Sequence, residues 1–168
     1  MGQDDTKHNL LFISKYPEII HEFTDAMKDR DIEIETAING IEAAAKIKKK
    51  NYDVVITGLS LEGYNGEQII TYLNKTAPST VCIIYTTTIS SAQLHFFINE
   101  RNVFRVFLRP VDFRGAFWEA LEEAYEYHAV QVKNEEDTGA RRQEQEKQER
   151  EIEIMDQRMR SQRQARET

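Results

Sequence analysis

Cysteine is almost absent from the sequence. The single cysteine, Cys82, lies inside the apolar run Val81-Cys82-Ile83-Ile84, so an intramolecular disulfide cannot form. A lone cysteine in such a run is typical of a small buried hydrophobe. This low cysteine content is typical of proteins in a reducing compartment, and we expect a cytoplasmic protein.

A hydrophobic run long enough to cross a membrane is also missing. No stretch approaches the roughly 18 consecutive apolar residues that a spanning helix needs. Residues 1–9 are polar and acidic, whereas a secretory signal is basic and then apolar. We therefore expect a soluble protein that does not associate with membranes.

Positive charge is in deficit. The chain has 22 Lys and Arg residues against 29 Asp and Glu residues, and its formal net charge is -7. Nonspecific binding to nucleic acid or to anionic lipid needs a basic face, so neither is expected as the main activity. A local basic patch is still compatible with this balance. A transcription regulator acting through the C-terminal region is disfavoured because no helix-turn-helix pattern is apparent.

The residue patterns of catalytic and metal sites are lacking too. The histidines His8, His21, His95 and His128 are scattered singly, without the spacing of metal ligands. We find no paired acids, no nucleophile beside a base and no glycine-rich phosphate loop. These absences argue against an enzyme with a different small-molecule activity, and we expect no cofactor and no metal.

The sequence does contain enough apolar residues for one core. Of its 168 residues, 40% are hydrophobic and 10% aromatic, which suits one domain with an appendage. Val54, Val55 and Ile56 form an apolar run between a polar entry and a glycine-rich exit, as in a strand buried on both faces of a parallel sheet. In such sheets the functional crevice lies beyond the carboxyl ends of the strands.

Strand patterns alternate with helix patterns five times along the chain. The expected strands are residues 10–13, 32–37, 54–56, 81–85 and 103–108. The expected helices are residues 18–29, 41–50, 67–75, 92–100 and a long final helix that Asp112 can cap. This order predicts a doubly wound α/β parallel sheet with helices on both faces.

Several short motifs occur at matching places along this pattern. They are Pro17-Glu18-Ile19, Asn39-Gly40, Tyr52-Asp53-Val54-Val55, Gly63-Tyr64-Asn65-Gly66 and Phe107-Leu108-Arg109-Pro110. Across residues 7–128 the chain thereby resembles the receiver domain of two-component response regulators. The resemblance implies a flavodoxin-like fold with strand order 2-1-3-4-5.

The residues that carry receiver chemistry are replaced in this sequence. Receivers use an aspartate as phosphoacceptor and two further acids to hold magnesium. At the matching positions this chain has Gly58 for the phosphoacceptor and Ser14-Lys15 for the acidic pair. Arg109 replaces the lysine that contacts the phosphoryl group in receivers. The hydroxyl residue that receivers carry at the end of the fourth strand corresponds to Thr86 or a neighbour. The resemblance thus implies a degenerate phosphorylation pocket.

A receiver fold without its nucleophile predicts a particular function. We expect a phosphorylation-independent pseudo-receiver that acts as a protein interaction or dimerisation module in signal transduction. Its partner would be a signalling protein, an output domain or a second copy of the chain. The alternative is that the vacated pocket binds a small anionic or nucleotide ligand through Lys15 and Arg109. These two cations could instead pair with nearby acids or face solvent.

Two apolar stripes run along the last helix. Trp118, Leu121, Tyr125, His128 and Val132 follow a heptad-like spacing, which favours a coiled-coil seam. Either one stripe packs on the sheet and the other meets a partner, or both belong to a wide buried face. From the usual partner surface of receivers, the expected partner or dimer face consists of Phe96, Phe97, Phe107, Trp118, Leu121 and Tyr125.

The C-terminal region differs in composition from the rest. Residues 134–139 form an acidic break, and residues 140–167 are dominated by Gln, Glu and Arg, which are strong helix formers. Ile152, Met155 and Met159 provide only a brief apolar seam. We therefore expect a receiver-like domain over residues 1–132, a linker at residues 133–139, and a charged helical or partly disordered tail over residues 140–168.

Overall fold

The computed structural model describes residues 8–167, in which strands and helices alternate. In chain order they are β1 (His8–Ile13), α1 (Pro17–Met27), β2 (Ile32–Ala37), α2 (Gly40–Lys49), β3 (Val54–Thr57), α3 (Gly66–Thr76), β4 (Val81–Thr86), α4 (Ser91–Asn99), β5 (Arg105–Leu108) and α5 (Ala116–Glu167).

The five strands form one parallel sheet in the order β2-β1-β3-β4-β5. Strand β3 lies at its centre, and all four of its residues are buried. In the register, Ile56 of β3 lies opposite Phe12 of β1 and Ile83 of β4. The doubly wound flavodoxin-like fold and its strand order are therefore confirmed.

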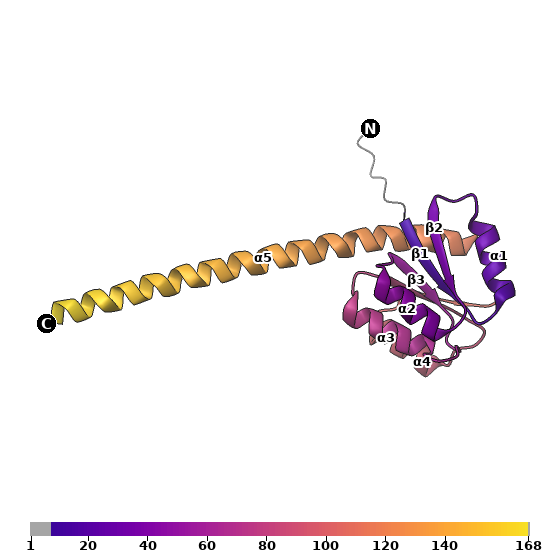
Figure 1. The fold of residues 1–168 in the computed structure, drawn as a ribbon, viewed down its shortest axis with the longest axis horizontal. Helices are drawn as coiled ribbons and strands as arrows, with labels where there is room; N and C mark the ends of the chain where they lie inside the picture. The colour runs from indigo at the N-terminus through magenta and orange to yellow at the C-terminus, as the bar shows by residue number, and fades with distance from the viewer. Residues whose placement is uncertain (1–7, 168) are drawn as a thin grey trace, which may run out of the picture. The chain divides into compact units, whose positions relative to one another are not determined.

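Side chains alternate between the two faces of the sheet and build a separate core on each. Leu10 and Phe12 pack with residues of α1 and of the first turns of α5, whereas Leu11 and Ile13 pack with residues of α2, α3 and α4. Figure 1 shows α2, α3 and α4 together on one side of the strands, with α1 on the other. Strands β1, β3 and β4 consequently contain continuous apolar runs, because both of their faces are covered.

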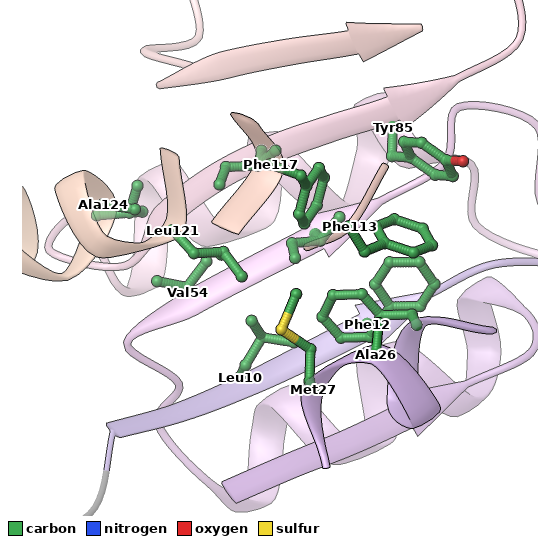
Figure 2. Close-up of a cluster of buried hydrophobic side chains, with 14 of the residues drawn as sticks. Leu10, Phe12, Ala26, Met27, Val54, Tyr85, Phe113, Phe117, Leu121 and Ala124 are labelled. Carbon is green, nitrogen blue, oxygen red and sulfur yellow. The ribbon is translucent and has the colours of Figure 1, made fainter. Parts of the chain in front are cut away.

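Aromatic rings fill much of the core beside α1 and α5 (Figure 2). The rings of Phe12 and Phe23 stack at 4.2 Å between centroids. Phe113 and Phe117 meet edge to face at 5.0 Å, and Tyr85 lies 5.3 Å from Phe113. This packing holds the ends of β1 and β4 in place beneath the crevice at the carboxyl edge.

Side-chain caps begin three of the helices where the sequence indicated turns. The side chains of Asn39, Asn65 and Ser90 accept hydrogen bonds from backbone amides in the first turns of α2, α3 and α4. At the last helix the expected cap is wrong: Asp112 accepts a hydrogen bond from the amide of Arg114, in a turn that precedes Ala116.

Helix α5 continues through residues 133–139, where we expected a linker. Gly139 lies inside the helix and does not end it, because one glycine costs only about 1 kcal/mol relative to alanine and its neighbours favour helix. By contacts, the chain divides into the units Met1–Val130 and Gln131–Thr168. Whether residues 133–139 separate functional domains stays a prediction.

Membrane spans were sought among residues 8–167. No helix there combines the length with the apolar character that crossing a bilayer requires.

Candidate functional site

A small cleft lies beyond the carboxyl ends of β1, β3, β4 and β5. All five residues predicted for the degenerate pocket line it: Ser14, Lys15, Gly58, Thr86 and Arg109. Tyr16, Leu59, Ser60, Tyr85 and Thr87 complete the lining, and the cavity volume is about 60 Å³. The parallel sheet brings these distant residues together because its strands all end at the same edge.

The floor of the cleft is formed by Gly58. Its amide donates a hydrogen bond to the carbonyl of Ile13, at 3.0 Å, which fixes its backbone. A Cβ atom built on Gly58 would have its nearest neighbours, the carbonyl oxygens of Tyr85 and Ile13, at 3.6 and 3.9 Å. These are ordinary contacts, so the packing leaves room for a side chain at this position.

Gly66 differs from Gly58 in this respect. A Cβ atom on Gly66 would lie 2.2 Å from the carbonyl oxygen of Gly58. The amide of Gly66 also donates to the carbonyl of Leu59, at 3.0 Å. The close approach of α3 to the loop after β3 therefore requires glycine at 66, whereas no steric contact requires it at 58.

Two cations meet at one aromatic ring beside the cleft. The ammonium of Lys15 lies 5.2 Å from the ring centre of Tyr16, and the guanidinium of Arg109 lies 4.8 Å from the same centre. Lys15 Nζ also donates a hydrogen bond to Ser60 Oγ, at 3.3 Å. Among residues 8–167, no carboxylate oxygen lies within 4.0 Å of the nitrogen atoms of Lys15 or Arg109.

Arg109 also acts on the buried tyrosine of the cleft. Burial raises the pKa of Tyr85, and the charge and hydrogen bond of Arg109 oppose that rise without cancelling it. The Tyr85 hydroxyl therefore stays neutral and protonated at physiological pH. Its ring anchors the hydroxyl in the aromatic core described above.

The chemistry available in the cleft is limited by its lining. None of the described residues that line it carries a carboxylate, so the oxygen ligands that magnesium prefers are lacking and the residues do not fit that ion. The hydroxyl of Thr57 donates to the carbonyl of Gly58, and that of Thr86 donates to the carbonyl of Thr88. Within residues 8–167, neither hydroxyl donates to a side-chain base that could activate it as a nucleophile.

A second cluster of ionisable groups lies at the opposite, amino-terminal edge of the sheet. The carboxylate of Asp53 lies 3.1 Å from Nε2 of His128 and 3.7 Å from Nδ1 of His8. Tyr125 stacks on His8 with centroids 4.3 Å apart and donates its hydroxyl hydrogen to the carbonyl of Asn9. The sequence analysis treated these histidines as scattered, because nothing in their spacing signals that the fold joins them. No group of three or more potential metal ligands occurs among residues 8–167.

Asp53 makes this cluster sensitive to acid. Burial alone would raise the pKa of its carboxyl, but the hydrogen bond and electrostatic interaction with His128, the amide of Asn9 and the electrostatic interaction with His8 outweigh burial and lower the pKa. The folded carboxyl therefore loses its charge at a lower pH than the unfolded one. Its stabilising contribution is present above the unfolded pKa of about 4 and disappears as the pH falls through the folded value.

The variant Asp53→Asn should lower the free energy of unfolding by about 1–3 kcal/mol near pH 6, because the imidazole of His128 loses a charged partner. The difference from the wild type should shrink as the pH falls below about 4. Urea unfolding followed by Trp118 fluorescence over a pH series measures both effects. The exposed Asp25→Asn serves as the control, with an expected loss of about 0–1 kcal/mol. A difference that does not vary with pH would show that the charge of Asp53 is not the cause.

The six residues predicted for a partner face pack against both sides of the sheet. Phe96 and Phe97 pack on the side of α2 and α3, whereas Phe107, Trp118, Leu121 and Tyr125 pack on the side of α1. Trp118 is half-buried, and the guanidinium of Arg30 lies 4.3 Å from its ring centre. Phe97, Leu121 and Tyr125 are buried, so these three belong to the core. The prediction is corrected for these three residues, and the stripes of α5 form one wide buried surface up to Tyr125. Whether Phe96, Phe107 and Trp118, which are only partly buried, meet a partner stays a prediction.

The structure exposes apolar residues that the sequence analysis passed over. Leu94 and Ile98, on the outer side of α4, have 41% and 43% of their surface exposed, and Leu108 at the end of β5 has 50% exposed. The sequence does indicate this exposure. Helix α4 carries apolar residues at 94, 96, 97 and 98, and these positions are too many to lie on a single buried face.

Comparisons with known proteins agree with this geometry. The family model of the response regulator receiver domain matches residues 11–115. No curated protein matches the sequence significantly. Among solved structures, the signal receiver domain of an HD domain-containing protein from Pseudomonas fluorescens Pf-5 is 19% identical with a TM-score of 0.70, and the match covers 74% of this chain and 99% of that one.

Two further solved structures show the same fold. A CheY-like response regulator receiver domain protein from Methanospirillum hungatei JF-1 is 18% identical with a TM-score of 0.68, covering 74% of this chain and 99% of its own. A structure described as adenylate cyclase from Rhodopirellula baltica is 20% identical with a TM-score of 0.71, covering 78% of this chain and 96% of its own. At these sequence identities the similarity establishes the fold alone.

Proposed function

The chain belongs to the response regulator receiver domain family, and from this premise we propose that it signals by protein contact without being phosphorylated. Receiver domains serve two-component signalling by contacting signalling proteins or output domains. This chain would make such contacts without the phosphorylation that usually controls them.

The observation that carries this proposal is Gly58 on the floor of a cleft without carboxylates. An aspartyl phosphate needs a carboxylate oxygen to attack the phosphoryl group, and a glycine supplies none. Magnesium, which would neutralise the incoming phosphoryl charge, finds no carboxylate ligand at Ser14 or Lys15. Because the packing at Gly58 would admit a side chain, steric need does not account for the missing nucleophile.

The exposed apolar residues of α4 support the contact half of the proposal. Leu94 and Ile98 are one turn apart and point away from the core, while Phe97 between them is buried. In receivers this region is a usual place for dimerisation and partner contact. We take a second copy of the chain as the occupant, because a two-fold contact places the same apolar patch on both sides.

Sedimentation velocity over a concentration series tests both halves. The wild type should self-associate to the same extent with and without acetyl phosphate and magnesium. The variant Leu94→Asn/Ile98→Asn should remain monomeric, because it removes the apolar patch from an exposed surface. Ile41→Asn, which changes a 63% exposed isoleucine on α2, is the matched control and should associate like the wild type.

Two results would count against the proposal. A change in association on adding acetyl phosphate and magnesium would contradict independence from phosphorylation. A wild type that stays monomeric at high concentration would contradict self-association through α4.

A further inference from the structure

The cleft at Gly58 holds two cations that no described carboxylate neutralises. Lys15 follows β1 and Arg109 follows β5, yet both lie against the ring of Tyr16. We propose that this cleft binds a small oxyanion of the phosphate or sulfate type directly, by charge and hydrogen bonds, without a metal ion.

Both cations are held in place before any ligand arrives. The ammonium of Lys15 is fixed by Ser60 Oγ and by the Tyr16 ring. The guanidinium of Arg109 lies over the same ring, 4.8 Å from its centre. Because a guanidinium has five N–H donors, most of those of Arg109 remain available to a ligand. Preorganised donors of this kind bind anions at a low entropic cost.

Hydroxyl groups add neutral donors to the same cleft. Ser60 accepts from Lys15, so its own hydroxyl hydrogen can point into the cleft. Thr87 also lines the cleft, and its hydroxyl makes no hydrogen bond with any of residues 8–167. Charged donors supplemented by hydroxyls complement the several acceptor oxygens of a tetrahedral oxyanion.

The size of the cleft decides which anion fits. Its volume of about 60 Å³ is at least about five times smaller than the roughly 300–1,000 Å³ of pockets that bury a drug-sized ligand. The cleft therefore favours inorganic phosphate or sulfate over a nucleotide. A free anion also needs no nucleophile, so Gly58 is compatible with this binding.

The net charge of the chain does not favour anion binding, so the attraction must come from the cations beside the cleft. With a formal charge of -7, the protein as a whole repels anions, and only the adjacent cations can favour one. The interaction is partly exposed, so added salt should weaken it.

Isothermal titration calorimetry with inorganic phosphate and with sulfate, in EDTA and at constant ionic strength, tests the proposal. The wild type should bind either anion saturably at millimolar concentration, with chloride as the reference. Lys15→Gln and Arg109→Gln should each weaken binding by about tenfold or more, since each removes one charge-assisted contact. Lys49→Gln, which changes an exposed lysine outside the cleft, should bind like the wild type.

Gly58→Asp provides a second test that does not depend on removing a cation. Its carboxylate would occupy the cleft floor, where a Cβ atom fits, and should abolish anion binding by repulsion. Circular dichroism verifies that each variant is folded. The proposal is overturned if the wild type shows no heat beyond that of chloride, if binding requires added magnesium, or if folded Lys15→Gln and Gly58→Asp bind as tightly as the wild type. The proposed contact through α4 does not depend on this result.

Discussion

Replacing Phe117 with alanine should lower the free energy of unfolding by about 3–5 kcal/mol. Phe117 is fully buried, and its ring contacts those of Phe23, Tyr85, Phe107 and Phe113, so it joins α5 to α1, β4 and β5. Truncation would leave a cavity that four rigid rings cannot close. Since domains are typically stable by about 5–15 kcal/mol, much of the stability would be lost.

Urea unfolding measured by the fluorescence of Trp118, the single tryptophan, follows this loss in the unit that contains the sheet. Phe104→Ala is the matched control, because Phe104 is only half-buried and stacks on Tyr127 near the surface. Its loss should be clearly smaller. Equal losses in the two variants would mean that the aromatic cluster does not hold α5 on the sheet as described.

Restoring three carboxylates to the cleft should restore metal binding and phosphorylation. In the variant Ser14→Asp/Lys15→Asp/Gly58→Asp, two acids would face magnesium and a third would supply the nucleophile. The new Cβ at position 58 meets only ordinary contacts, and residues 14 and 15 lie at the cleft already. We expect magnesium binding to rise from undetectable to millimolar affinity, and acetyl phosphate to add one phosphoryl group.

Calorimetry with magnesium and intact-mass spectrometry measure these two gains. The variant with asparagine at the same three positions has nearly the same shape without the negative charge, and it should show neither gain. If the aspartate variant folds but binds no magnesium, the cleft differs from a receiver pocket in more than its missing acids.

The part of the fold that depends on local pattern was predictable from the sequence. The apolar run of β3 indicated a central buried strand, and Asn39 and Asn65 marked the starts of α2 and α3. The carboxyl ends of parallel strands must meet at one edge, so the residues of the cleft could be placed together before their distances were known.

What failed depended on contacts between distant segments. Spacing along α5 could not decide which stripe the sheet would cover, and Leu121 and Tyr125 proved to be buried. The meeting of His8 and His128 at Asp53 requires the first strand and last helix to be packed together. Helix α5 runs through residues 133–139, because an acidic composition does not by itself end a helix; whether these residues link two functional parts stays a prediction.

Intact-mass spectrometry of the wild-type chain after incubation with acetyl phosphate and magnesium shows whether the cleft accepts a phosphoryl group. We expect no increase in mass, because Gly58 offers no carboxylate oxygen to the phosphoryl group. The restored aspartate variant in the same experiment shows that the reagent is active. A stoichiometric mass gain of one phosphoryl group in the wild type, located by peptide mapping at Thr57, Ser60 or another residue of the cleft, would contradict this expectation.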